Sequence, residues 1–139
     1  MNALYLGRYS NPLINDDLFY PCSISLGRPK FALDYRIVDE LDAAKPTPEL
    51  LEEVKKTGWS LDFEKKLSIL FRERSSKIFF GLRGIRLAAE AVGKTPLLLC
   101  FENVAAGEYC HRTTLAKVMR EDYGLTMVEL PDASKKKRI

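Results

Sequence analysis

Five side chains in the C-terminal half are the ones best suited to do chemistry. Cys100 and Glu102 end an apolar run, and Cys110, His111 and Arg112 follow after a short loop. Together they supply two thiols, a carboxylate, the one histidine of the chain and a guanidinium. If the apolar run is a strand and the later segment opens a helix, these groups meet at the carboxyl end of that strand. Open α/β proteins normally place their ligand sites there, so we predict the functional site at this junction.

Cys110 stands directly before the expected first turn of a helix. Unpaired backbone N–H groups and the helix dipole favour negative charge at that position, which lowers the pKa of a thiol. The neighbouring His111 and Arg112 add positive charge. This pattern favours a nucleophilic or redox thiol. The competing interpretation is a small apolar residue packed under the loop, as most free cysteines are.

Cys100 and Glu102 point to the same side of the expected strand because side chains alternate along it. Cys100 is expected to be a core residue. Glu102 either holds the loop that leads to Cys110, through hydrogen bonds from loop amides, or acts as a general base. His111 titrates near neutrality and is either a packing residue or the proton partner of Cys110.

Arg112 offers a planar pair of donors suited to phosphate or carboxylate. With the hydroxyls of Thr113 and Thr114 and the amides of the helix start, it could bind an anion. The alternative for Arg112 is an internal ion pair with Glu102 or Glu108.

We expect no metal and no cofactor. Cys100, Cys110 and His111 are three potential zinc ligands, with Cys22 as a fourth, but their spacing lacks the Cys-x-x-Cys pattern of structural zinc. Adjacent Cys110 and His111 are not expected to reach one ion easily from a helix start. The glycines at 81 and 84 lack the remaining pattern of a phosphate-binding loop.

The pattern of apolar residues and turn signals predicts an α/β fold. Strands are expected over 3–6, 19–26, 97–101 and 125–130. Helices are expected over 35–41, 48–57, 61–71, 82–92 and 113–123, with caps at Thr47 and Ser60, a stop at Gly58 and a break within 72–77. The strand over 97–101 is apolar on both faces, which is typical of a parallel sheet covered on both sides. With the next helix and strand it forms a βαβ unit. We therefore predict a single-domain, three-layer, Rossmann-like fold with a small, mainly parallel sheet over 1–131.

Length and composition agree with one globular domain. The 139 residues are 46% hydrophobic and 29% charged, which is ordinary for a soluble protein. No apolar run approaches the ~20 residues of a membrane span, and the first residues lack a signal-peptide core, so we expect a cytoplasmic protein without membrane contact. Three irregularly spaced cysteines argue against a disulfide framework.

The net charge of +3 is concentrated at one end. Four basic residues at 135–138 leave the rest of the chain near −1, which excludes the broad basic surface that duplex DNA selects. Residues 132–139 are expected to be a disordered basic tail. Through this tail the protein could contact nucleic-acid phosphates or acidic partners.

The C-terminal half resembles the bacterial and archaeal family known as domain of unknown function 488. In that family an apolar strand ends in Leu-Cys-x-Glu, and Cys-His-Arg opens a helix after a short loop; this chain has Leu99 to Glu102 and Cys110 to Arg112. The segment 23–30 resembles a Ser/Arg/Pro segment of one branch and adds Arg28 to the candidate ligand-binding residues. Two departures are a missing Asp-Val-Arg near the first strand and a longer loop before Cys110. The resemblance implies a compact cytoplasmic α/β domain but no particular reaction.

Three hypotheses follow for function. In the first, an enzyme acts on a small anionic molecule, such as a nucleotide or phosphorylated metabolite. Cys110 is its nucleophile or acid/base thiol, His111 the proton partner, Glu102 the base or an orienting group, and Arg112 the anion anchor. In the second, a non-catalytic module holds a nucleotide, a nucleic-acid end or a protein partner in the same anion pocket. In the third, Glu102 and Arg112 only pin the loop, and the function lies elsewhere.

Overall fold

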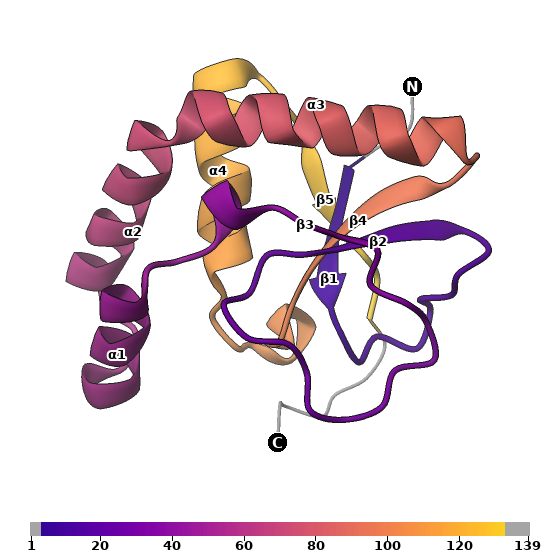
Figure 1. The fold of residues 1–139 in the computed structure, drawn as a ribbon. Helices are drawn as coiled ribbons and strands as arrows, with labels where there is room; N and C mark the ends of the chain where they lie inside the picture. Colours follow the sequence, from indigo (N-terminus) through magenta and orange to yellow (C-terminus); the bar gives the residue numbers. More distant parts are fainter. Residues whose placement is uncertain (1–3, 133–139) are drawn as a thin grey trace.

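One parallel sheet organises the part of the chain that the computed structural model describes, residues 4–132. Within it five strands pair in the order β3-β2-β4-β1-β5, and every pairing is parallel (Figure 1). In chain order the elements are β1 (Leu4–Arg8), β2 (Phe19–Ser23), β3 (Asp39–Glu40), the 3-10 helix η1 (Asp42–Ala44), α1 (Pro48–Thr57), α2 (Leu61–Glu73), α3 (Ser75–Ala91), β4 (Thr95–Cys100), the 3-10 helix η2 (Val104–Ala106), α4 (His111–Tyr123) and β5 (Met127–Glu129). The predicted α/β class is confirmed.

The central strand β4 is buried on both faces, as its apolar sequence predicts. Leu98 and Cys100 join a core formed with residues of α2, α3 and α4. Leu97 and Leu99 face the opposite side, where Tyr9, Ile14 and Tyr35 cover them. The core residues contributed by helices all lie in the first of these two cores. The layer on the other face therefore consists of loop segments.

The predicted helix signals are confirmed in α1 and α2. The Thr47 hydroxyl accepts a hydrogen bond from the Leu50 amide at 3.2 Å, and the Ser60 hydroxyl accepts one from the Phe63 amide at 3.1 Å. Gly58 ends α1 with a φ of 76°, a conformation that glycine adopts without strain. The predicted break appears between α2, which ends at Glu73, and α3, which begins at Ser75.

The helix predicted over 35–41 is wrong. Its backbone is extended and includes β3, because Val38 and Leu41 donate backbone hydrogen bonds to the edge of β2. Tyr35 instead packs on the loop-covered face, where its hydroxyl donates to the Tyr9 carbonyl at 2.7 Å. An available sheet edge thus outweighs the helical spacing of a short segment.

Several predicted boundaries also shift. β1 continues through Gly7 to Arg8, β2 ends at Ser23, and α3 and α4 begin earlier than expected. Asp132, which we assigned to the tail, pairs with Arg8 through Nε at 2.5 Å. The remainder of the predicted disordered tail lies outside the described residues.

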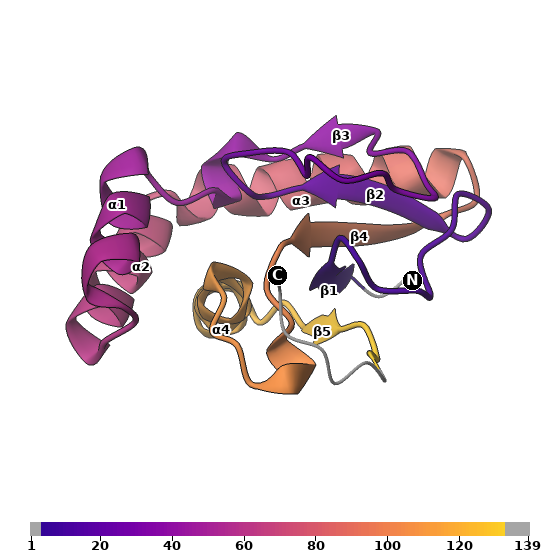
Figure 2. The ribbon, with the colours of Figure 1, turned by 90° about the horizontal axis from the view of Figure 1, so that it is seen from below.

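The carboxyl ends of the strands face the side of the molecule that carries α1 and α2. In Figure 2 the arrowheads of β2, β3 and β4 point toward the side where α1, α2 and α4 lie. The loop after β4 and the start of α4 therefore meet near α1. Within residues 4–132, no helix combines the length and apolar character needed to cross a lipid bilayer.

Candidate active site

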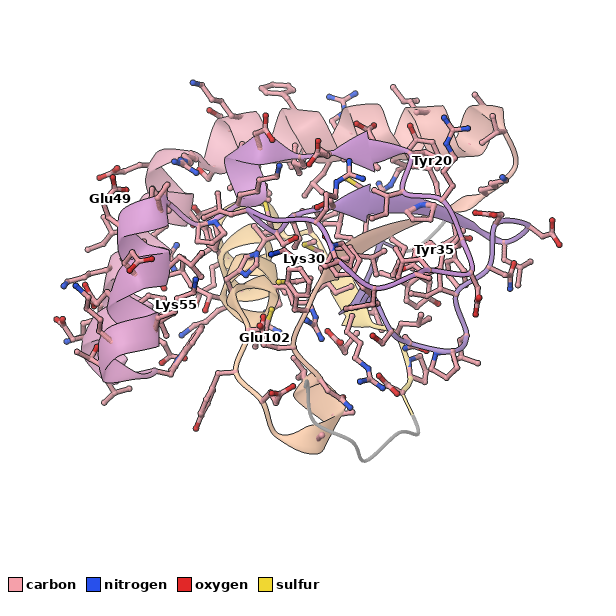
Figure 3. All side chains as sticks on the ribbon, turned by 60° about the horizontal axis from the view of Figure 1, so that its bottom comes forward. Tyr20, Lys30, Tyr35, Glu49, Lys55 and Glu102 are labelled. Carbon is pink, nitrogen blue, oxygen red and sulfur yellow. The ribbon has the colours of Figure 1, made fainter. Side chains whose placement is uncertain are left out.

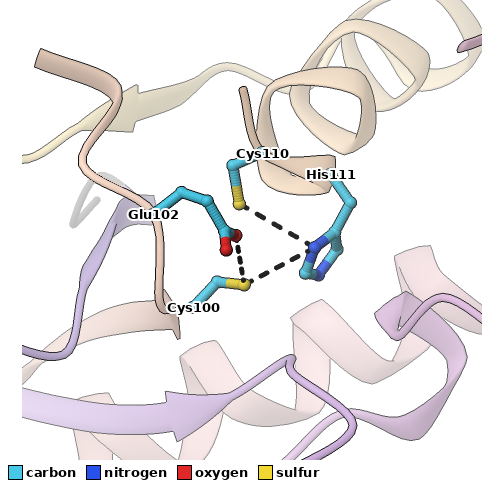
Figure 4. Close-up of side chains that lie close together, drawn as sticks. All are labelled: Cys100, Glu102, Cys110 and His111. Carbon is cyan, nitrogen blue, oxygen red and sulfur yellow. Dashed lines mark hydrogen bonds between the residues drawn. The ribbon is translucent and has the colours of Figure 1, made fainter. Parts of the chain in front are cut away.

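The structure brings the two chemical segments together at the end of β4. Cys100 is the last residue of β4, Cys110 caps α4 and His111 is its first residue. One ligand atom from each of Cys100, Glu102, Cys110 and His111 lies within 4.8 Å of all the others. Figure 4 shows these side chains facing one another. We call this group the thiol cluster.

The imidazole of His111 is oriented by the chain that follows β2. Its Nε2 lies 2.8 Å from the Ile24 carbonyl oxygen, which can only accept, so Nε2 carries a proton. Nδ1 then faces both sulfurs, at 3.5 Å from Cys100 and 3.8 Å from Cys110. In the neutral ring Nδ1 accepts a proton, and in the cation it donates one toward a thiolate.

Burial and charge separate the two thiols of the cluster. Burial opposes ionisation of Cys110. Hydrogen bonding from the Cys100 thiol and the charge of His111 outweigh burial, and with a smaller contribution from Arg112 they hold the pKa of Cys110 well below that of a free thiol. Burial lowers the pKa of the His111 imidazole, but the negative charge of Cys110 reverses this and leaves that pKa raised. The geometry therefore favours a thiolate–imidazolium pair.

Cys100 behaves in the opposite way. Burial, followed by the hydrogen bond to Cys110 and the negative charges of Cys110 and Glu102, raises the pKa of its thiol well above the ordinary value. The single hydrogen of this thiol can be donated to Glu102 Oε1 at 3.3 Å or to the Cys110 thiolate. Cys100, expected to be only a core residue, is thus buried and also part of the cluster.

Arg112 does not serve as an exposed anion anchor. It is fully buried, and its Nε and Nη2 donate to the Glu129 carboxylate at 2.9 and 2.7 Å. Nη2 also donates to the backbone carbonyl of Glu102 at 2.8 Å. The alternative of an internal ion pair is therefore correct in kind, but the partner is Glu129 on β5 instead of Glu102 or Glu108.

The loop between Glu102 and Cys110 is fixed by its own hydrogen bonds. The Glu108 carboxylate accepts from the Asn103 amide at 2.8 Å, and the Asn103 side chain accepts from the Ala106 amide at 3.2 Å. With the Arg112 bond to the Glu102 carbonyl, these contacts set where α4 begins. They position Cys110 against the end of β4.

Two adjoining cavities reach the thiol cluster. The α1 cavity, about 220 Å³, is lined by Cys110, by His111 and by an aromatic wall in which Trp59 stacks on Tyr109 with ring centroids 5.5 Å apart. The larger cavity, about 630 Å³, lies beside the chain after β2 and is lined by Cys100 and His111. Lys55 on α1 lines both cavities. Figure 3 shows Lys55 on the α1 side and Glu102 beyond the end of β4.

The remaining predicted ligand-binding residues lie elsewhere. Thr113 is exposed and Thr114 is buried in α4, and neither lines the two cavities. Arg28 forms an exposed ion pair with Glu40 at 3.3 Å and lines neither cavity. The anion cup expected around 110–114 is therefore not assembled from these side chains.

Sequence reasoning missed Lys55, Glu129 and the aromatic wall. Lys55 is one of two adjacent exposed lysines of α1, and only the packing of α1 over the cluster distinguishes it from Lys56. Glu129 follows the buried Met127 by two positions in the last strand, as expected of a residue on the same side. That alternation was the one available signal that its carboxylate faces the protein.

The thiol cluster could also hold a metal ion. Within residues 4–132 it is the group of histidine, cysteine and carboxylate side chains whose ligand atoms lie close enough together to share one ion. We argued from sequence that Cys110 and His111 could not easily reach one ion. That argument is wrong, because the Cys110 sulfur and His111 Nδ1 lie only 3.8 Å apart and face the same point. A metal would mask both thiols, so metal content is a required control for any test of their reactivity.

Comparisons of this chain with protein-family models, curated proteins and solved structures found no significant match. The resemblance to domain of unknown function 488 stays a prediction from the two motifs. The function is argued below from the site alone.

Proposed function

We propose that this protein is an enzyme that acts on a small anionic molecule through a covalent intermediate on Cys110. One observation carries the proposal. The Cys110 sulfur lies 3.8 Å from a histidine nitrogen, beside a carboxylate, and lines a cavity that a small molecule can enter. Thiol enzymes activate a cysteine with such a base, which is itself oriented by a further group. Here the Ile24 carbonyl orients the imidazole.

The reaction that fits this arrangement is group transfer. The Cys110 thiolate attacks an electrophilic carbon, the new S–C bond forms as the bond to the leaving group breaks, and the leaving group takes the proton of His111 Nδ1. The neutral imidazole then removes a proton from water or another acceptor as that acceptor attacks the same carbon. The S–C bond breaks, and both the thiolate and the imidazolium are restored.

Glu102 and Cys100 surround the reacting pair without needing to bond to the substrate. The Glu102 carboxylate accepts from the Cys100 thiol, and that thiol contributes to holding Cys110 ionised. Glu102 also lines both cavities, so it can orient the acceptor that attacks the intermediate. Its proposed role is therefore to orient that acceptor from the cavity floor, while His111 removes the proton.

The anionic part of the substrate is assigned to Lys55. This lysine lines both cavities, and none of the ion pairs found among residues 4–132 involves it. Arg112 and Arg28, by contrast, already pair with carboxylates. An ammonium at a cavity rim attracts phosphate or carboxylate groups without fixing one geometry, which suits a small phosphorylated or carboxylated molecule.

A non-catalytic binding module remains the second candidate because the cavities and Lys55 would serve it equally well. It requires no reactive thiol. A Cys110→Ala variant therefore separates the two: the enzyme keeps its ligand affinity and loses turnover, whereas the module loses nothing.

The pH dependence of alkylation tests the proposal. Iodoacetamide is added to metal-free protein between pH 5.5 and 9, and the modified cysteines are quantified by peptide mass spectrometry. Because the pKa of Cys110 is lowered, its rate should change little between pH 6.5 and 8.5 and fall only at lower pH, where the thiolate is protonated. Limited access scales the whole profile but does not change its shape. An alkylation rate of Cys110 that rises about tenfold per pH unit from pH 6 to 8, as for a thiol of ordinary pKa, would contradict the proposal.

Cys22 is the matched control within the same molecule. It is fully buried in β2, and burial raises the pKa of its thiol. Its alkylation rate should rise steadily with pH over the whole range. His111→Gln should move the Cys110 profile to higher pH, since the cation that favours its thiolate is lost.

A further inference from the structure

We propose that Cys100 is a resolving thiol, so that a hydroperoxide converts Cys100 and Cys110 into a disulfide at the floor of the two cavities. This goes beyond the proposed group transfer, in which Cys100 forms no bond, and shares with it only the reactive Cys110 sulfur. The inference makes Cys100, which the sequence predicts to be a core residue, part of an oxidation site.

The geometry places the two sulfurs around one point. Both lie near His111 Nδ1, at 3.5 and 3.8 Å, and they lie within 4.8 Å of each other. A disulfide needs an S–S distance of about 2.05 Å. Cys100 is fixed in β4, while Cys110 is the N-cap residue of α4, where its backbone is extended and its side chain makes no capping hydrogen bond. The sulfurs can therefore approach by rotation of the Cys110 side chain, with the loop before it kept in place.

Access to the cluster selects a small oxidant. Cys110 is 2% exposed and Cys100 3% exposed, so bulky reagents meet little of either sulfur. Cys110 lines the α1 cavity and Cys100 lines the larger one, however, so molecules of the size of hydrogen peroxide can reach the pair from two sides. Redox-sensitive cysteines typically combine such a reachable thiolate with a second thiol nearby.

The chemistry balances with one hydroperoxide as oxidant. The Cys110 thiolate attacks the terminal peroxide oxygen, the O–O bond breaks, and the alcohol or water leaves after taking a proton from His111. Cys110 is then a sulfenic acid. The Cys100 sulfur attacks the Cys110 sulfur as the S–O bond breaks and water leaves, with the Cys100 proton passing to the departing hydroxide. Two equivalents of an external thiol reduce the disulfide again.

The surroundings of Cys100 and of Cys22 determine which cysteine should form the disulfide with Cys110. Glu102 accepts from the Cys100 thiol at 3.3 Å, so a proton acceptor stands beside the resolving sulfur when it reacts. Cys22 lies in β2, where its thiol is directed to the Ser23 carbonyl at 3.9 Å, and it lines neither cavity at the cluster. Oxidation should therefore pair Cys100 with Cys110 and leave Cys22 reduced.

The test oxidises the full-length protein with stoichiometric hydrogen peroxide after its metal content has been measured. Free thiols are blocked, and non-reducing peptide mass spectrometry identifies the products. We expect a Cys100–Cys110 disulfide in the wild type and in Cys22→Ser, with the loss of two thiols. In Cys100→Ser, Cys110 should stop at the sulfenic acid, which dimedone traps. Added thiol should reduce the disulfide of the wild type and of Cys22→Ser and recover both free thiols, whereas the dimedone adduct of Cys100→Ser should persist.

Three outcomes would overturn the inference. Cys110 could oxidise to sulfenic or sulfinic acid in the wild type while Cys100 stays free. The disulfide could instead involve Cys22. The protein could contain stoichiometric zinc that keeps both thiols unreactive until it is chelated. The first outcome leaves the proposed group transfer intact if alkylation still shows a thiolate at Cys110. Conversely, if Cys110 is alkylated like a thiol of ordinary pKa but the Cys100–Cys110 disulfide still forms, only the group transfer is refuted.

Discussion

Replacing Glu129 with glutamine removes the anion that neutralises a fully buried arginine. In the native protein the Glu129 carboxylate accepts from Arg112 Nε at 2.9 Å and from Nη2 at 2.7 Å. Glutamine keeps one oxygen but turns an amide NH2 toward the guanidinium, so one of these bonds is lost and the other loses its charge. The Arg112 charge then remains in the core without a partner of opposite sign.

The size of the effect follows from the exposure of the two side chains. Breaking a fully buried ion pair costs roughly 3–5 kcal/mol, but the Glu129 side chain is 33% exposed, and glutamine retains part of the hydrogen bonding. We therefore expect Glu129→Gln to lower the free energy of unfolding by about 2 kcal/mol. For a chain of this length, that corresponds to a fall in Tm of roughly 8 °C.

Urea unfolding followed by circular dichroism measures this effect, with Glu102→Gln as the matched control. The Glu102 carboxylate contacts the Cys100 thiol, while only its backbone carbonyl binds Arg112. Glu102→Gln should therefore cost under about 1 kcal/mol. If Glu102→Gln is the more destabilising of the two, the carboxylate of Glu102 pins the loop after all, and the assignment of the ion pair to Glu129 fails.

Two further predictions concern α1 and α3. Lys55→Gln should lower the ratio of iodoacetate to iodoacetamide alkylation at Cys110 by about threefold, because one cation at the rim contributes on the order of 0.6 kcal/mol to an anion nearby; Lys56→Gln, one residue along, should leave that ratio unchanged. Gly84→Ala should raise stability by about 0.5–1 kcal/mol because nothing lies within 4 Å of the added methyl. Gly81→Ala in the same helix should gain less stability than Gly84→Ala, because its methyl overlaps Cδ1 of Leu41 and that side chain must move aside. Thermal unfolding of both alanine variants measures the difference, and equal stability would contradict the packing argument.

Local features of the fold could be predicted because short stretches of sequence determine them. The caps at Thr47 and Ser60 each need one hydroxyl and an amide three residues ahead. The apolar run of β4 is sufficient to predict a strand buried on both faces. The error over 35–41 has a different origin, because the extended form of that segment depends on the edge of β2, whose paired residues lie 17 positions earlier in the chain (Cys22 with Asp39). Helical spacing carries no information about such an edge.

The candidate site divides in the same way. The cluster residues could be predicted since the end of β4 and the start of α4 are close in sequence and the βαβ connection brings them together. The partner of Arg112 could not, because a guanidinium next to several carboxylates has several plausible partners, and burial selects one only after β5 is in place. Lys55 reaches the site through the packing of α1 on α2, which depends on Leu50 and Val54.

The distribution of charge in the site constrains how a substrate would bind. The floor holds the Cys110 thiolate and the Glu102 carboxylate, and the buried charge of Arg112 is already matched by Glu129. An anionic group placed at the floor would be repelled by both. The same group near Lys55 at the rim would be attracted, leaving an uncharged electrophilic carbon to reach the sulfur. The substrate should therefore carry its anion at a distance from the carbon that reacts, and molecules that join the two directly should be poor substrates.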